Sequence, residues 1–191
     1  MPRNFLMGFA NLSVFEGVVD SAEEYSSGTK NALIGAYSCS PSDTRSEYNI
    51  DADDDPSWDG GSDWEYTDLA IQVRQMALDD LARFTGDVIA PSGTNAGELI
   101  EGTSDAPIVG LSFSALRRDG GYRLYRYFRC KLMSYSVEHQ TKGTEVAAQN
   151  YTLNIRAYHR AYDQQVRATK DVDPGDALTW LDTLGDLPVS P

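Results

Sequence analysis

The chain has 191 residues, so a single domain can bury roughly 70% of the surface that the unfolded chain exposes and fold without a disulfide or a structural metal. Its 29 acidic and 16 basic side chains give a net charge of −13. This excess of acids disfavours sequence-specific nucleic-acid binding, where neutralisation of phosphates supplies much of the affinity.

The cellular setting follows from what the sequence lacks. No stretch has the apolar length of a membrane span, and the first fifteen residues show no signal-peptide pattern. The two cysteines, Cys39 and Cys130, lie far apart and are predicted to be free, buried thiols. We therefore expect a soluble protein that is made in a reducing cytoplasm.

The first third of the chain alternates β-forming stretches with polar breaks. Residues 5–19 are apolar and residues 32–38 repeat the pattern, so both are predicted to form strands. Residues 41–62 are acidic and contain a proline and two adjacent glycines, which predicts a long loop. Because Trp58 and Trp64 lie in or beside this segment, we expect it to become ordered against a partner.

The middle of the chain contains the clearest predicted helix. Residues 65–73 are first predicted to resume as a strand. Residues 76–86 follow, with Leu78 and Leu81 at helical spacing and Gly86 suited to the C-terminal end of a helix.

Residues 107–137 organise the rest of the chain, because they predict two long antiparallel strands joined by a tight turn at residues 118–121. Gly120 and Gly121 can adopt the positive φ that such a turn requires. Apolar and polar residues alternate along both strands, which predicts one buried and one solvated face. The predicted buried set is Val109, Leu111, Phe113, Ala115, Leu124, Phe128, Cys130 and Leu132, and the predicted solvated set is Arg123, Tyr125, Tyr127, Arg129 and Lys131.

The last third predicts one more strand and one more helix. Residues 146–160 are predicted to form a long strand, and Asp173 followed by Pro174 is typical of the start of a short helix. The whole pattern predicts a mainly β protein with one or two short helices, in which two antiparallel sheets pack as a sandwich or half-barrel.

One acidic segment resembles the start of a calcium loop. Asp51, Asp53 and Asp55 occupy its first three odd positions, but Pro56 and Ser62 stand where an EF-hand requires glycine and glutamate. The segment is therefore interpreted as solvated or facing a partner.

The remaining sequence predicts no catalysis. His139 and His159 have no cysteine or histidine at metal-binding spacing, and no phosphate loop or nucleophile elbow is present. We expect no enzyme, no metal and no cofactor.

Charge is placed unevenly along the chain. Residues 43–68 carry ten acids and one base, whereas residues 117–131 carry six bases and one acid. This asymmetry would let the acidic part of one copy dock near the basic part of another. The tyrosines between cations at 123–131 allow two interpretations: a subunit interface, which needs fewer assumptions, or a platform for single-stranded nucleic acid.

Several segments form a recognisable layout when taken in order. They are residues 35–37, 50–54, the predicted helix at 76–86, and residues 119–127, 140–143 and 158–160. Over roughly residues 5–180, this layout resembles the major tail tube proteins (major tail proteins) of long-tailed bacteriophages with non-contractile tails, the siphoviruses. The hairpin, the Thr-Lys-Gly turn and the final strand match best. The helix lacks the proline that the family has near its start.

The resemblance implies a structural protein of the virion tail that is assembled in the bacterial host cytoplasm. Copies form hexameric rings that stack into a hollow tube, and one sheet of each subunit continues into its neighbour's to close a barrel. The implied partners are further copies, a tail terminator, a tape measure protein and tail tip proteins, with no membrane. Double-stranded DNA passes during ejection without specific binding, which predicts a net negative lumen that repels phosphate.

Under this interpretation, residues 1–191 are a single tail-tube domain with an N-terminal arm (about 1–10), the acidic loop (about 42–62) and a C-terminal arm (about 165–191). The residues expected to join rings are Asp51, Asp53, Asp54, Asp55, Trp58 and Asp59, and those expected in an inter-subunit sheet are Arg123, Tyr125, Tyr127, Arg129 and Lys131. Two alternatives stay open: a nucleic-acid-binding β-protein that uses the face at 123–129, and a tube protein of a secretion or injection machine.

Overall fold

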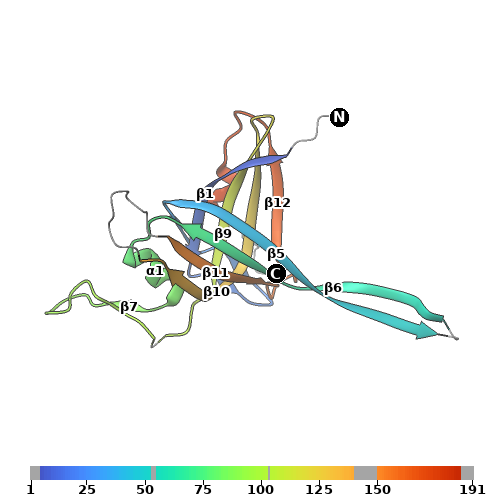
Figure 1. Ribbon diagram of the computed structural model, residues 1–191, viewed down its shortest axis with the longest axis horizontal. Helices are drawn as coiled ribbons and strands as arrows, with labels where there is room; N and C mark the ends of the chain where they lie inside the picture. The colour runs from blue at the N-terminus through green and yellow to red at the C-terminus, as the bar shows by residue number, and fades with distance from the viewer. Residues whose placement is uncertain (1–4, 53–54, 103, 140–149, 186–191) are drawn as a thin grey trace.

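The structure is a computed structural model that describes residues 5–52, 55–102, 104–139 and 150–185, with the backbone path alone at 49–52 and 55–59 (Figure 1). The fold is mainly β, as predicted, with one short α-helix and one turn of 3-10 helix among the described residues. In chain order the elements are β1 (Leu6–Glu16), β2 (Val19–Asp20), β3 (Tyr25–Ser26), β4 (Thr29–Ala32), β5 (Ala36–Ala52), β6 (Asp55–Val73), α1 (Leu78–Thr85), β7 (Val88–Ile89), β8 (Leu99–Ile100), β9 (Val109–Arg117), β10 (Tyr122–Val137), β11 (Tyr151–Tyr158), β12 (Arg167–Val172) and η1 (Thr179–Asp182).

The large strands belong to one continuous antiparallel sheet of eight strands, where the sequence predicted two sheets. Its order is β4-β1-β9-β10-β11-β6-β5, and β12 also pairs with β10. β10 is the centre of the sheet: one edge pairs with β9, while the other pairs with β12 along residues 122–127 and with β11 along residues 129–137. In Figure 1 β12 stands upright whereas β5 and β6 run lengthwise across it. The described residues form no closed barrel within one chain.

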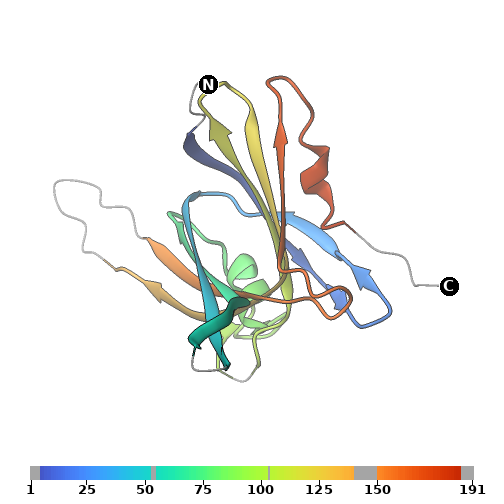
Figure 2. The same ribbon diagram turned by 90° about the vertical axis from the view of Figure 1, so that its right-hand side faces the viewer.

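β5 and β6 correct the prediction of a loop at residues 41–62. The two strands, of 17 and 19 residues, pair along their length and extend as a two-stranded arm beyond the rest of the sheet (Figure 1), and Figure 2 looks along this arm toward the body. β11 pairs with β6 only from Thr67 to Val73, so the arm begins where that pairing ends. A two-stranded ribbon with both faces in solvent needs no alternation of apolar residues, which is why the acidic sequence indicated a loop.

The main core lies on one face of the sheet, where side chains from β1, β6, β9, β10 and β11 meet Leu81 and Phe84 of α1. The opposite face of β9 and β10 is covered as well. Leu184 packs there with Phe15 and Phe128, and it lies so close to Gly110 that an added Cβ would stand 1.9 Å from its methyl carbon. The region of β9 and the first half of β10 is therefore buried on both faces.

A β-bulge between Tyr127 and Cys130 changes which side chains of β10 face the main core. Tyr127 is opposite Leu111, but Cys130 is opposite Val109, so β10 contains one extra residue there. Tyr125 and Tyr127 consequently share the core face with Cys130, and Tyr127 is 0% exposed. The prediction that these tyrosines lie on a solvated face is wrong, because it assumed unbroken alternation.

The central hairpin and the helix are confirmed, whereas the strand predicted at residues 32–38 is divided by a turn between β4 and β5. The central hairpin forms, and its turn residue Gly120 has a φ of +86°. Helix α1 ends at Gly86, which has a φ of +77° and donates its N–H to the Ala82 carbonyl oxygen at 2.8 Å.

The C-terminal part differs from the prediction. The predicted helix start at Asp173 is a turn, closed by a hydrogen bond from the Asp176 N–H to the Asp173 carbonyl oxygen. The only helical turn described after it is η1. Strand β12 was not predicted, because its sequence RATKDV has no apolar alternation.

Candidate functional site

The lengthwise part of the main sheet is the candidate site, and we call it the half-sheet. It consists of β11, residues 129–137 of β10, residues 67–73 of β6 and residues 36–43 of β5. Directly opposed residues share a face, so each row of partners can be followed from strand to strand. One row runs from Lys131 through Arg156 and Asp68 to Ser42.

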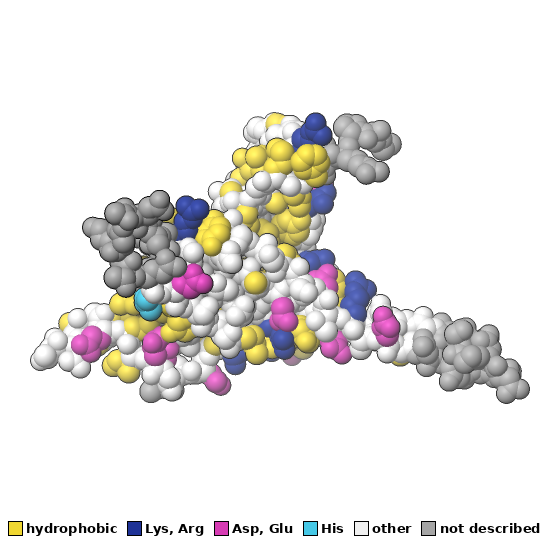
Figure 3. Space-filling model, in the orientation of Figure 1, with side chains coloured by type: hydrophobic (Ala, Val, Ile, Leu, Met, Phe, Trp, Pro, Cys, Tyr) yellow, Lys and Arg dark blue, Asp and Glu magenta, His cyan; other side chains and the backbone are white. Residues whose placement is uncertain are grey.

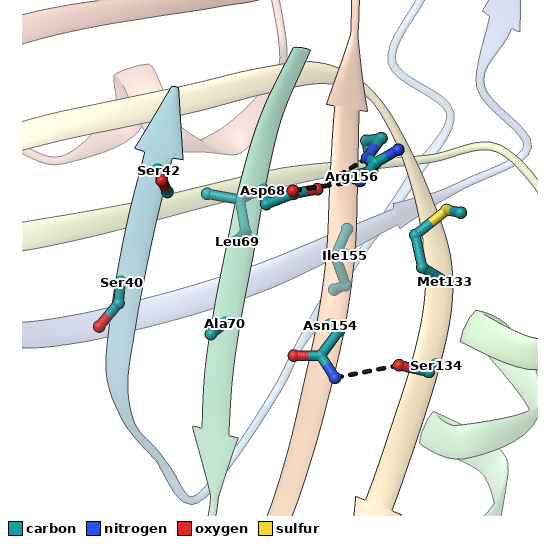
Figure 4. A pocket seen from close by; sticks show the side chains of 10 residues that line it. All are labelled: Ser40, Ser42, Asp68, Leu69, Ala70, Met133, Ser134, Asn154, Ile155 and Arg156. Atoms are coloured by element: carbon teal, nitrogen blue, oxygen red, sulfur yellow. Dashed lines mark hydrogen bonds and ion pairs between the residues drawn. The ribbon is translucent and has the colours of Figure 1, made fainter. Parts of the chain in front are cut away.

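The outer face of the half-sheet, opposite the main core, consists mostly of small polar side chains. It contains Ser38, Ser40, Ser42, Asp68, Ala70, Gln72, Ser134, Ser136, Thr152, Asn154 and Arg156, and nearer the arm also Arg129, Lys131 and Tyr158. The Asn154 amide donates to Ser134 Oγ at 3.0 Å (Figure 4). Short polar side chains that hydrogen-bond to one another leave few groups on the surface to bind a passing molecule.

One ion pair crosses this face. Arg156 donates from Nε and Nη2 to the two carboxylate oxygens of Asp68, at 2.7 and 3.1 Å, and its guanidinium lies 3.7 Å from the centre of the Tyr66 ring (Figure 4). Beside the pair is a shallow depression of about 290 Å³ that reaches Ser40, Ser134 and their neighbours. The charges of this pair cancel locally.

Both lateral edges of the half-sheet are open. β5 ends the strand order and, within the described residues, pairs only with β6. At the other side, the pairing of β9 with β10 stops at Cys130, so residues 131–137 of β10 have no described strand partner on that edge. Unpaired edges of this kind can accept a strand from another molecule.

The residues predicted for an inter-subunit sheet divide between two environments. Arg123, Tyr125 and Tyr127 lie where β10 is paired on both edges, so that section cannot add a neighbour's strand. Arg123 forms a two-point ion pair with Asp171, which holds the pKa of that carboxyl below its usual value. Tyr125 stacks on Phe113 with ring centres 4.9 Å apart. No open Arg/Tyr platform forms from these residues.

Arg129 and Lys131 lie instead at the root of the arm, in a pocket of about 570 Å³. Its walls are formed by Glu65, Arg129, Lys131, Tyr158, His159, Ala161 and Gln164. Arg129 also lies 3.4 Å from the buried carboxylate of Asp20. The pocket therefore gathers positive charge where β6 leaves the body.

His159 lines this pocket and also contacts the backbone of the arm. Its Nδ1 lies 2.5 Å from the Gln164 carbonyl oxygen and its Nε2 2.6 Å from the Trp64 carbonyl oxygen. The guanidinium groups of Arg45 and Arg167 both lie near the Trp64 ring, at 5.2 and 4.7 Å from its centre, so this tryptophan is ordered by its own chain.

The side chains predicted to join rings, Asp51, Asp53, Asp54, Asp55, Trp58 and Asp59, lie outside the described side chains, and so does the calcium-like pattern. The described residues contain no group of three or more His, Cys, Asp or Glu side chains placed to hold a metal ion.

Sequence reasoning did not single out the serines of the outer face, on β5 and β10, as site residues. The alternation of Leu153, Ile155 and Ala157 with polar residues in β11 was the signal that marked this face.

Comparison with known proteins adds no identification. Among the described residues, no helix is long and apolar enough to cross a membrane. The chain matches no protein-family model, and it matches no curated protein sequence.

Proposed function

We propose that this protein is the structural subunit of a phage tail tube, in which copies join side by side into hexameric rings and the rings stack around a channel for DNA. The observation that carries the proposal is the half-sheet, which has four antiparallel strands and an open edge on each side. The resemblance of the sequence to major tail proteins supports the same assignment.

The strand count of the half-sheet suits a repeating assembly. β10, β11, β6 and β5 alternate in direction, so the first and last strands run opposite to one another. When β5 of one copy lies beside residues 131–137 of the next copy's β10, the new pair is again antiparallel. A head-to-tail contact that repeats in this way closes into a ring when the rotation between copies sums to a full turn, and a closed ring leaves no edge unpaired.

In such a ring we assign the outer face of the half-sheet to the channel wall. Hydroxyl and amide groups offer DNA no lasting contact, and Asp68 offsets Arg156. Arg129 and Lys131 both add positive charge to this face, and Asp20 offsets only Arg129, so the net negative lumen expected from the sequence depends on nearby acids such as Glu65.

The arm formed by β5 and β6 has the form expected of an element that reaches the next ring. It leaves the body at one end of the half-sheet and extends along the long axis of the molecule (Figure 1). Its sequence is acidic, with Glu47 and Asp63 among its exposed described residues. We propose that it fixes the spacing between stacked rings.

The test is electron microscopy of the negatively stained protein over a concentration series, together with light scattering on a sizing column. Rings or hollow tubes of constant diameter are expected. A protein that stays monomeric at every concentration, even with polyethylene glycol added to favour association, contradicts the proposal. A small oligomer that binds single-stranded DNA with steep salt dependence favours the nucleic-acid alternative instead.

A further inference from the structure

A groove of about 520 Å³ opens beside the unpaired edge of β10, at the end of the half-sheet away from the arm. It is lined by Leu78, Leu81, Glu98, Leu99, Glu101, Tyr135, Val137, His139 and Tyr151. Leu78 is 49% exposed and Ile100, beside the lining residue Leu99, is 50% exposed. Hydrophobic side chains, with acidic ones among them, gather on the end of the molecule that carries α1 and β7 (Figure 3).

The opposite edge of the half-sheet carries a protruding side chain. Ile34 lies in the turn before β5 and is 83% exposed, more than any other described large hydrophobic residue. The turn is fixed, because the Arg74 N–H donates to the Gly35 carbonyl oxygen at 3.0 Å. Gly35 has a φ of +92°, a conformation that suits glycine. Ile34 is therefore held outward at the start of the free edge strand.

We propose that Ile34 of one copy inserts into this groove on the next copy and sets the register of the contact between neighbours in a ring. The inference rests on the proposed function, since it needs the sheet to continue from β5 to the neighbour's β10. The inference names the groove as the site of that contact and Ile34 as the side chain that fills it.

The register of the sheet supports the placement. One row of partners runs from Ala36 through Val73 and Tyr151 to Val137. If the row continues, the next copy's Ala36 lies beside Val137, and its Ile34, two residues earlier on an antiparallel strand, lies beside His139 in the groove. The inner faces also match, because Ala36 and Tyr151 both pack against the main core.

Charges on the two surfaces are complementary. Arg74 is exposed and lies beside Ile34's turn, with its guanidinium 5.2 Å from the Tyr37 ring centre. The groove carries Glu98 and Glu101, both exposed. The Tyr135 hydroxyl donates to Glu101, which raises the pKa of Tyr135 to about 12 and holds one wall of the groove.

The test is disulfide formation in the double variant Ile34→Cys/His139→Cys, the two positions that the continued register places side by side. Within one molecule these positions are separated by three strand spacings, roughly 14 Å, too far for a disulfide. Under mild oxidation we expect covalent multimers up to the size of a ring on a non-reducing gel. The natural thiols should form no disulfides under these conditions. Burial raises the pKa of Cys39 to about 12, and Cys130 is 0% exposed.

Four further variants sharpen the result. Neither single cysteine variant should form multimers, since the contact joins different surfaces. Arg74→Glu should raise the concentration needed for assembly roughly threefold, as expected for a rim charge, and Glu98→Lys added to it should restore most of that loss.

The outcomes separate the inference from the proposed function. Multimers of the double variant together with charge-swap rescue support the inference. Rings or tubes that form without any cross-link overturn it while the tube assignment stands. If the wild-type protein never assembles, the tube assignment fails and the inference fails with it.

Discussion

The two halves of β10 show how one strand serves two purposes. Residues 122–127 are paired on both edges, by β9 and β12, and both of their faces are covered. Residues 131–137 are paired on one edge, and their outer face carries exposed serines. The first half can only stabilise the subunit, whereas the second keeps backbone groups available for a neighbour. Stability and association therefore depend on different parts of the molecule.

Removal of the arm is the strongest test of whether stability and association depend on different parts of the molecule. Replacing residues 47–62 by Asn-Gly joins the paired residues Ser46 and Asp63 by a two-residue hairpin turn. The arm lies outside the core, so we expect a melting temperature within a few degrees of wild type and complete loss of tubes. Circular dichroism and electron microscopy measure the two effects.

The control for this deletion is the isolated ring. Side-by-side contacts do not involve the arm, so single rings should survive in the deletion variant. Tubes of normal length from the deletion variant would show that the arm does not join rings, and a molten subunit would show that it belongs to the folding unit.

Two adjacent residues of β11 test the faces of the half-sheet. Ile155 is 1% exposed in the main core, whereas Asn154 points to the outer face. Ile155→Ala should lower the free energy of unfolding by about 2–5 kcal/mol, from lost burial and the cavity that remains. Asn154→Ala should change it by less than about 0.5 kcal/mol. Urea unfolding of the monomer measures both, and equal losses would mean that the outer face is buried.

The sequence predicted the elements whose local pattern is strong. The hairpin turn at Gly120 and the helix end at Gly86 depend on backbone conformations that glycine favours, and such signals are local. The arm was missed because a solvated ribbon has no buried face to impose alternation. The bulge before Cys130 was missed because one extra residue leaves no mark in the sequence but shifts every later side chain to the other face.

The candidate site was harder to predict than the fold. Arg123 and Lys131 look alike in the sequence, yet only Lys131 lies beside an open edge, because β9 and β12 close both edges around Arg123 whereas the pairing with β9 stops at Cys130. Which edge is open therefore depends on where other strands end, and not on the local sequence of β10. The groove for Ile34 likewise joins α1, β8 and β10, and no local pattern brings these together.

A half-buried ion pair in the stable part of the molecule gives a smaller predicted effect than Ile155→Ala, and that effect depends on pH. Arg160 is 4% exposed and lies 4.0 Å from the centre of the Phe128 ring. It donates to both carboxylate oxygens of Asp163 and holds the pKa of that carboxyl below its usual value. At pH 7, Asp163→Asn should cost about 1.5–3 kcal/mol, the range for a hydrogen bond to a charged group.

Because the pKa of Asp163 is lower in the folded state, the stability it contributes is fully present above its unfolded pKa, about 3.9. That stability is lost as the pH falls through the folded pKa, so wild type and Asp163→Asn should converge below about pH 4 in urea unfolding. Asp68→Asn is the matched control on the outer face, where the ion pair with Arg156 is half-exposed and should contribute less than about 1 kcal/mol. A difference between wild type and Asp163→Asn that stays constant down to pH 2.5 would mean that the carboxylate charge does not hold Arg160 in place.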